Sequence, residues 1–353
     1  MKILHTADLH LASPLTSRLS PEKREVRLCE LNDTFFFLLT VAKREGVRAV
    51  LLCGDIFDSA AVTAPEVSSF LSAIRENGAI DFFYVSGNHE KDLLRGYNLP
   101  TNLHIFGDKL ETFTIENVTF TGKSTLTPDL FSDLSLPRDW INILLLHGSA
   151  NGGTAGEIPL AAARGREIDY LALGHYHTYG VLPIDARGVA VYAGMPEGRG
   201  FDETGEKGCV LLDTEGGRIS HRFLKTARRV LHDIPLDLSS LSEGESAERR
   251  ASDLLSEIPR EDLVRLSLIG EPPQWLMLPT VRLRYLFAER FFYFEVKDRT
   301  LPADAHTKEG SPLRRAFVSS VESDEGLNDE ERAAVLRMGF AALEGGEIPL
   351  DHI

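Results

Sequence analysis

Five polar clusters, each directly after a short apolar run, constrain the fold of this chain more than any other feature of its sequence. The apolar runs are rich in aliphatic and aromatic residues and lie at residues 2–6, 49–53, 82–85, 141–146 and 170–173. Such runs predict buried β-strands. The polar clusters contain Asp8 and His10, Asp55, Asn88 and His89, His147, and His175 and His177. Since α/β folds place their sites at the carboxyl ends of strands, we expect these side chains to meet.

Helical patterns separate these strands, and this alternation is typical of layered α/β folds. Ser20 predicts the start of one helix, whose apolar residues recur at three-to-four spacing until Gly46. Thr63 and Glu66 form a capping box for a second helix, which we expect to end near Asn77. The first part of the chain is therefore predicted to be an α/β protein.

The length of the chain predicts more than one domain, because 353 residues exceed the roughly 250–300 at which a single core stops growing. The polar stretch PLDLSSLSEGES, at 235–246, predicts a boundary near residues 229–246. We expect a main domain at residues 1–230, a small α/β domain at 231–300 and a helical tail at 301–353.

Composition excludes several classes of protein. The net charge of −15 argues against nonspecific coating of nucleic acid, whose affinity comes mainly from Lys and Arg. Residues 231–353 hold 24 acidic and 14 basic side chains, so most of the acidic surplus is C-terminal. We expect no signal peptide and no membrane-spanning segment, because the apolar runs are far shorter than roughly 18 residues. Cys29, Cys53 and Cys209 form no close pair, which fits a reducing cytoplasm and predicts no thiolate metal site.

Each polar cluster alone has an ordinary explanation as a turn, a cap or a satisfied core histidine. Together they hold five of the eleven histidines, and such burial makes sense chiefly if shared cations neutralise the site. Carboxylate, imidazole and amide ligands suit divalent manganese, our first choice, or iron or zinc. Two ions about 3.5–4 Å apart can hold a phosphate and activate water. Asp55 is the natural bridge between them, whereas Asn88 offers one carbonyl oxygen to a single ion.

The ordered motifs DLH, GD, GNH, HG and GHxH resemble those of calcineurin-like metallophosphoesterases. ADLHLASPL at 7–15, GDIFD at 54–58 and YAGMPEGRGFDETGEKG at 192–208 resemble SbcD-type DNA repair exonucleases, particularly their YhaO-like branch. The resemblance covers residues 1 to about 225 and continues more loosely to MGFAALEGG at 338–346. It implies a layered metallophosphoesterase sandwich, with two sheets flanked by helices, a small C-terminal α/β cap domain and a helical tail.

The resemblance also implies roles for individual residues. One ion is held by Asp8, His10, Asp55 and His177, and the other by Asp55, Asn88, His147 and His175. His89 then stabilises the phosphoryl group or protonates the leaving oxygen, which is worth about 10²–10⁴-fold in rate. Archaeal and eukaryotic members carry a second catalytic histidine where this chain has Asp58, so Asp58 either orients a ligand or caps the following turn.

Other basic residues have two interpretations each. Arg199, in a glycine-rich loop, is a candidate for binding substrate phosphate, although pairing with a nearby carboxylate is the commoner role. The basic stretch at 218–229 is either a track for a phosphate backbone or a solvated face. Six histidines outside the clusters are expected to be structural: His5, His104, His221, His232, His306 and His352.

The leading hypothesis is a two-metal phosphodiesterase, in particular a DNA exonuclease or endonuclease of DNA repair. The resemblance implies DNA as the substrate, an ATPase partner of the SMC-like SbcC type, and a homodimer as in other members. A phosphoesterase for a small nucleotide or cyclic nucleotide is the enzymatic alternative, and the acidic C-terminal part favours it. A non-catalytic interaction scaffold is the third hypothesis, and the complete ligand set argues against it.

Overall fold

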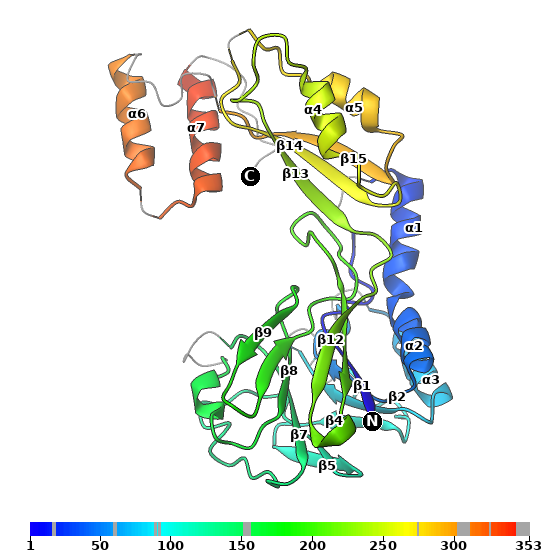
Figure 1. Cartoon of the computed structure of the whole chain (residues 1–353). Helices are drawn as coiled ribbons and strands as arrows, with labels where there is room; N and C mark the ends of the chain where they lie inside the picture. The colour runs from blue at the N-terminus through cyan, green and yellow to red at the C-terminus, as the bar shows by residue number, and fades with distance from the viewer. Residues whose placement is uncertain are drawn as a thin grey trace. The chain divides into compact units, whose positions relative to one another are not determined.

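In the computed structural model of the chain, Met1–Val230 and Leu231–Ile353 form two compact units. The structure describes residues 1–15, 19–58, 62–87, 90, 93–150, 157–273, 275–301, 311–324 and 326–343. In the first unit, two six-stranded sheets pack face to face (Figure 1). Their strand orders are β12-β11-β1-β2-β3-β4 and β5-β6-β7-β8-β10-β9.

The strands of the first sheet are β1 (Lys2–Thr6), β2 (Val47–Cys53), β3 (Asp81–Val85), β4 (Leu103–Phe106), β11 (Gly208–Asp213) and β12 (Ser220–Lys225). Those of the second sheet are β5 (Glu111–Ile115), β6 (Val118–Gly122), β7 (Ile141–His147), β8 (Tyr170–Gly174), β9 (Gly180–Pro183) and β10 (Val189–Tyr192). β1 to β4 run parallel, as do β6, β7, β8 and β10, so each set presents its carboxyl ends at one edge. The five predicted strands correspond to β1, β2, β3, β7 and β8, and the layered α/β fold is confirmed.

Alternation along the strands builds a core on each face of the first sheet. Between the sheets, Leu51 and Phe83 pack against residues of the second sheet, and the Phe83 and Phe120 rings stack with centroids 4.1 Å apart. On the outer face, Val50 and Phe82 pack in the cluster that includes the helical Phe35. Because β2 and β3 are covered on both faces, their sequences are apolar apart from Arg48 and Asp81.

The segment predicted as one helix forms two, α1 (Pro21–Asn32) and α2 (Thr34–Glu45), which meet at Asp33. The single-helix prediction was therefore wrong. The Thr34 hydroxyl donates to Glu30 O at 3.1 Å, and side-chain bonds of this kind compete with regular helix bonds. Hydrophobic spacing alone did not reveal this break, because it continues across it.

The next helix, α3 (Ala64–Glu76), begins at the predicted capping box, where Glu66 Oε2 accepts the Thr63 N–H at 2.7 Å. α2 and α3 lie along the outer side of the first sheet (Figure 1). The outer face of the second sheet is covered by residues 126–136 and by the short 3-10 helix at Leu160–Ala163.

The second unit contains a three-stranded parallel sheet in the order β13-β14-β15. Its strands are β13 (Leu231–Asp237), β14 (Leu263–Ile269) and β15 (Tyr293–Asp298), and its helices include α4 (Ala247–Leu254) and α5 (Thr280–Phe287). β13 lies where the sequence predicted a boundary without regular structure. It is an edge strand, so Pro235 is tolerated there, and Leu231 and Leu236 are buried.

The C-terminal helices α6 (Pro312–Glu322) and α7 (Asp329–Leu343) pack on each other. Leu336 and Phe340 of α7 are each 1 % exposed and belong to one cluster with Val321 of α6. The apolar face of α7 is thus occupied within its own unit. None of the helices within the described ranges is long and apolar enough to cross a membrane.

Candidate metal centre

Four of the predicted site residues adopt left-handed backbone conformations. Asp8 has φ 50°, His10 45°, Asp55 49° and His175 105°. Such angles are rare outside glycine and cost about 1–3 kcal/mol each, and they concentrate at functional sites. The strain therefore marks the loops after β1, β2 and β8.

The loops after β1 and β2 continue the pairing of their strands. Asp8 N donates to Gly54 O at 3.0 Å, and His10 N donates to Asp55 O at 3.0 Å. These bonds hold both clusters side by side at the carboxyl edge of the first sheet. Glycine at 54 is required there, because a Cβ would lie 2.3 Å from His147 Nδ1 of the second sheet.

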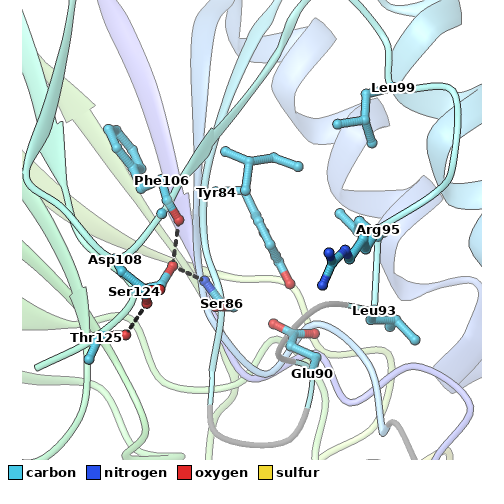
Figure 2. A pocket seen from close by; sticks show the side chains of 13 residues that line it. Tyr84, Ser86, Glu90, Leu93, Arg95, Leu99, Phe106, Asp108, Ser124 and Thr125 are labelled. Atoms are coloured by element: carbon cyan, nitrogen blue, oxygen red, sulfur yellow. Dashed lines mark hydrogen bonds between the residues drawn. The ribbon is translucent and has the colours of Figure 1, made fainter.

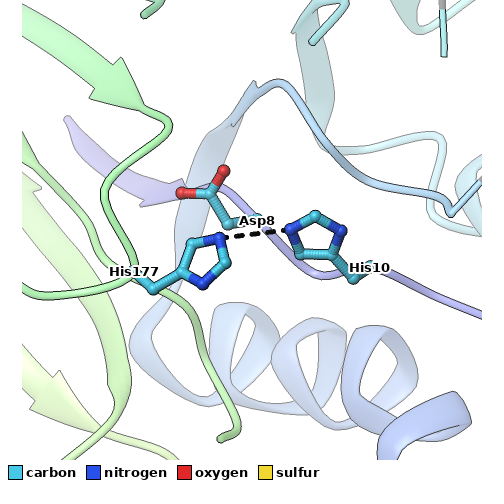
Figure 3. Close-up of side chains that lie close together, drawn as sticks. All are labelled: Asp8, His10 and His177. Atoms are coloured by element: carbon cyan, nitrogen blue, oxygen red, sulfur yellow. Dashed lines mark hydrogen bonds between the residues drawn. The ribbon is translucent and has the colours of Figure 1, made fainter. Parts of the chain in front are cut away.

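Asp8, His10 and His177 form a first group whose ligand atoms all lie within 4.8 Å of one another (Figure 3). The Nε2 atoms of His10 and His177 are 3.3 Å apart. This places an imidazole from each sheet beside a fully buried carboxylate.

Asp8, Asp55 and His147 form a second group that meets the same distance limit. His147 Nε2 lies 3.3 Å from Asp55 Oδ2, in a geometry that makes no hydrogen bond, and it is buried. His147 Nδ1 lies 2.9 Å from Cys53 O. The residue common to the two groups is Asp8, whereas the sequence interpretation assigned the shared position to Asp55.

Burial and neighbouring charges perturb the ionisation of these residues. Burial raises the pKa of Asp8 to about 7. Burial and the nearby Arg199 lower the pKa of His10 to about 4. For His147, burial acts to lower the pKa, but the carboxylates of Asp55 and Asp8 outweigh it and raise the pKa to about 9. Two buried carboxylates and a buried imidazole nitrogen without a hydrogen bond fit a site for divalent cations.

Of the other predicted site residues, His175 lies beside these groups. His175 donates its backbone N–H to both Asp8 carboxylate oxygens at 3.0 Å, and its ring meets that of His147 edge to face. Asp58 donates its backbone N–H to Leu11 O at 3.0 Å. Asn88 and His89 lie outside the described residues.

Arg199 is paired with a carboxylate, the commoner of its two expected roles. Its Nη2 donates to Glu203 Oε1 at 2.6 Å and its backbone N–H to Glu203 Oε2 at 2.7 Å. Glu203 Oε1 also accepts from His177 Nδ1 at 2.8 Å. Burial opposes ionisation of Glu203, but the hydrogen bonds from His177 and Arg199 outweigh it and lower its pKa to about 2. Sequence reasoning missed Glu203, although it lies in the quoted motif at 192–208.

Glu90 is a second residue that sequence reasoning missed. It is 2 % exposed, and its carboxylate accepts from Phe57 N at 2.8 Å and from Gly87 N at 3.3 Å. It thereby ties the loop after β2 to the loop after β3. Glu90 also lines a cavity of 560 Å³ with Tyr84 and Arg95 (Figure 2). Among the described residues, none of the candidate ligands lines this cavity.

The model of the calcineurin-like phosphoesterase family matches residues 1–179, which is half of the chain. The chain belongs to this family. The matched range includes all five polar clusters, so the fold and the resemblance read from the sequence are both confirmed.

Several proteins are similar to this phosphoesterase. The metallophosphoesterase YhaO of Bacillus subtilis strain 168 is 28 % identical over 309 residues, which cover 78 % of this chain and 74 % of YhaO. The DNA double-strand break repair protein Mre11 of Sulfurisphaera tokodaii is 26 % identical and covers 69 % of this chain and 67 % of its own length. The SbcD component of the SbcCD nuclease of Bacillus subtilis strain 168 is 27 % identical, covering 62 % of this chain and 67 % of that component.

Proposed function

We propose that this phosphoesterase is a two-metal phosphodiesterase that cleaves DNA, as a nuclease of DNA repair. The observation that carries the proposal is the convergence of two potential ligand groups, from four strand ends of two sheets, around the buried Asp8. A single tetrahedral site does not use this many ligands.

The proposed ligands follow the family pattern. Asp8, His10, Asp55 and His177 hold one ion, and Asp55, Asn88, His147 and His175 hold the other. A bound pair of divalent ions, manganese being our first choice, supplies positive charge for the phosphate and lowers the pKa of water to about 7. The buried carboxylates and the left-handed loops hold the ligand atoms in place before substrate arrives.

The residues outside the ligand set have separate proposed roles. His89 stabilises the reacting phosphoryl group or gives a proton to the leaving oxygen. Asp58 orients a neighbouring side chain from the loop that also carries Asp55. Binding of substrate phosphate by Arg199 stays a proposal. The pairing of Arg199 with Glu203 supports a structural role instead.

DNA is the proposed substrate because two similar proteins are a double-strand break repair protein and a component of a nuclease. By the same analogy, an SMC-like ATPase is the proposed partner, and the chain is proposed to form a homodimer. The three cysteines without a close pair support the cytoplasm as its proposed location. A phosphoesterase acting on small nucleotides is the alternative that the acidic residues 231–353 favour.

Purified full-length protein in manganese should be assayed on linear duplex DNA, closed circular DNA, cyclic nucleotides and bis-p-nitrophenyl phosphate. The proposal predicts metal-dependent cleavage of DNA, and comparison of linear with circular DNA separates exonuclease from endonuclease activity. Asp55→Asn serves as the inactive control.

Two results would contradict the DNA proposal. Hydrolysis of cyclic nucleotides and the small diester without DNA cleavage would favour the small-molecule phosphoesterase. Binding of two ions without hydrolysis of any substrate would favour a scaffold.

A further inference from the structure

The Glu203 carboxylate lies directly behind His177, outside every proposed ligand position. It is 5 % exposed, and its Oε1 accepts from His177 Nδ1 at 2.8 Å. The proton on Nδ1 leaves Nε2 as the nitrogen with a free lone pair, and Nε2 is the atom that lies 3.3 Å from His10 Nε2. The hydrogen bond therefore selects the tautomer of His177 in which the lone pair lies on Nε2, on the side of Asp8 and His10.

Glu203 is itself held in place on several sides. Arg199 donates to it through Nη2, through Nε at 3.2 Å and through its backbone N–H. Lys207 Nζ donates to the carbonyl oxygen of His177 at 2.9 Å. The loop from 199 to 207 thus positions both the backbone and the ring of His177.

This loop also has a buried anchor at its start. Arg27 is 1 % exposed and donates to Gly198 O at 2.6 Å and to Glu197 Oε1 at 2.7 Å. Because the two residues before Arg199 accept hydrogen bonds from Arg27 of α1, the Arg199 and Glu203 pair is anchored to that helix.

The corresponding nitrogen of His147 has a weaker partner. His147 Nδ1 faces the backbone carbonyl of Cys53 at 2.9 Å, which is a neutral acceptor. An anionic acceptor increases the basicity of an imidazole ligand more than a neutral carbonyl does. The imidazoles of the two groups therefore differ as donors.

We infer that Glu203 is a positioning residue for His177 and selectively strengthens one of the two ion sites, the one formed by Asp8, His10 and His177. Arg199 supports Glu203 in this role. The inference rests on the proposed two-metal function and deepens it, because it makes the two sites unequal in affinity.

The test is Mn²⁺ binding to the metal-free full-length protein by isothermal titration calorimetry. Glu203→Gln should lower the affinity for one of the two ions by about 10–100-fold and leave the affinity for the other unchanged. The manganese concentration for half-maximal hydrolysis of bis-p-nitrophenyl phosphate should rise in the same proportion. Turnover at saturating manganese should return close to that of the wild type.

Glu206→Gln is the matched control. It makes the same chemical change three residues further along the loop, where Glu206 is exposed and paired with Lys225. Both of its ions should bind as in the wild type. Arg199→Met removes the side chain that holds Glu203 but leaves the contact between Glu203 and His177. This variant should lower the affinity for the same ion by a smaller factor.

Three outcomes would overturn the inference. Unchanged affinity for both ions in Glu203→Gln would exclude a positioning role. Equal weakening of both ions with a lower Tm would indicate a general structural role. If Glu203→Gln does not fold, unchanged affinities in Arg199→Met would decide against the inference. Fewer than two ions on the wild type would instead contradict the proposed function.

Discussion

At the residue scale, Gly54 lies where a loop of one sheet approaches a side chain of the other. It has φ 80°, and a Cβ there would lie 2.3 Å from His147 Nδ1. Gly46, at the end of α2, has a similar φ of 70°, but a Cβ there would have no atom within 4 Å. A side chain at position 46 would therefore cause backbone strain alone, whereas one at position 54 would also collide with a candidate ligand.

Gly46→Ala should lower the free energy of unfolding by about 1–2 kcal/mol, the cost of a left-handed alanine. Gly54→Ala should lower it further and displace His147, so that manganese binding weakens as well. Urea denaturation and equilibrium dialysis of both variants measure these effects. Equal losses of stability with two tightly bound ions in both variants would show that the close approach is unimportant.

Removal of the His89 side chain and removal of the Asp55 side chain should have different effects on metal content. His89→Ala should keep both ions while losing about 10²–10⁴-fold in turnover, because its proposed role acts on rate. Asp55→Ala should lose metal, because two cations would then face one another without the intervening anion. Metal content and turnover are measured on the same preparations. A His89→Ala protein that loses an ion in proportion to its activity would identify His89 as a ligand.

At the element scale, a buried ion-pair network joins α1 to distant segments of the first unit. Arg27 Nη1 donates to Glu30 Oε2 at 2.9 Å, and its Nη2 donates to Glu197 Oε1 at 2.7 Å. Arg229 donates to both oxygens of Glu30 from the other side. The network thereby fixes α1, the loop before Arg199 and the last residues of the unit.

Arg27→Met should destabilise the protein by about 3–5 kcal/mol, because it leaves buried carboxylates without one of their partners. Arg24→Met is the control, since Arg24 is exposed on the same helix. Guanidinium denaturation of both variants gives the difference. A loss below about 1 kcal/mol for Arg27→Met would mean that Arg229 and backbone donors are sufficient for the two glutamates.

At the scale of the whole molecule, each unit has hydrophobic clusters of its own. Phe83 and Phe120 belong to the clusters of Met1–Val230, and Leu266 belongs to those of Leu231–Ile353. All of the candidate ligands lie in the first unit. Metal binding should therefore stabilise the two units unequally.

Differential scanning calorimetry of the full chain should resolve two transitions, of which manganese raises only that of the first unit. At a free ion concentration of 100 Kd, each site stabilises its unit by about 2.7 kcal/mol. EDTA should reverse the shift, and Asp55→Ala should show little of it. A single transition would mean that the units unfold together, and an equal shift of two transitions would mean that manganese stabilises both units equally.

The sequence by itself determined the elements whose signals are local. Apolar runs followed by Asp, Asn and His predicted the strands and their carboxyl ends, and Glu66 beside Thr63 predicted the start of α3. Asn328 and Glu331 form a capping box at the start of α7, which is a signal of the same local kind. These features depend on residues a few positions apart, so the sequence alone is sufficient to predict them.

Only the tertiary structure decided which distant side chains meet. The Glu203 contact with His177 joins residues 26 positions apart, and the Arg27 contact with Glu197 joins residues 170 positions apart. The left-handed angles of Asp8, His10 and Asp55 likewise occur where the loops after β1 and β2, which are far apart in the sequence, pair with each other. Hydrophobic periodicity indicates which face of an element is buried. The packing of the sheets decides which residues that face contacts.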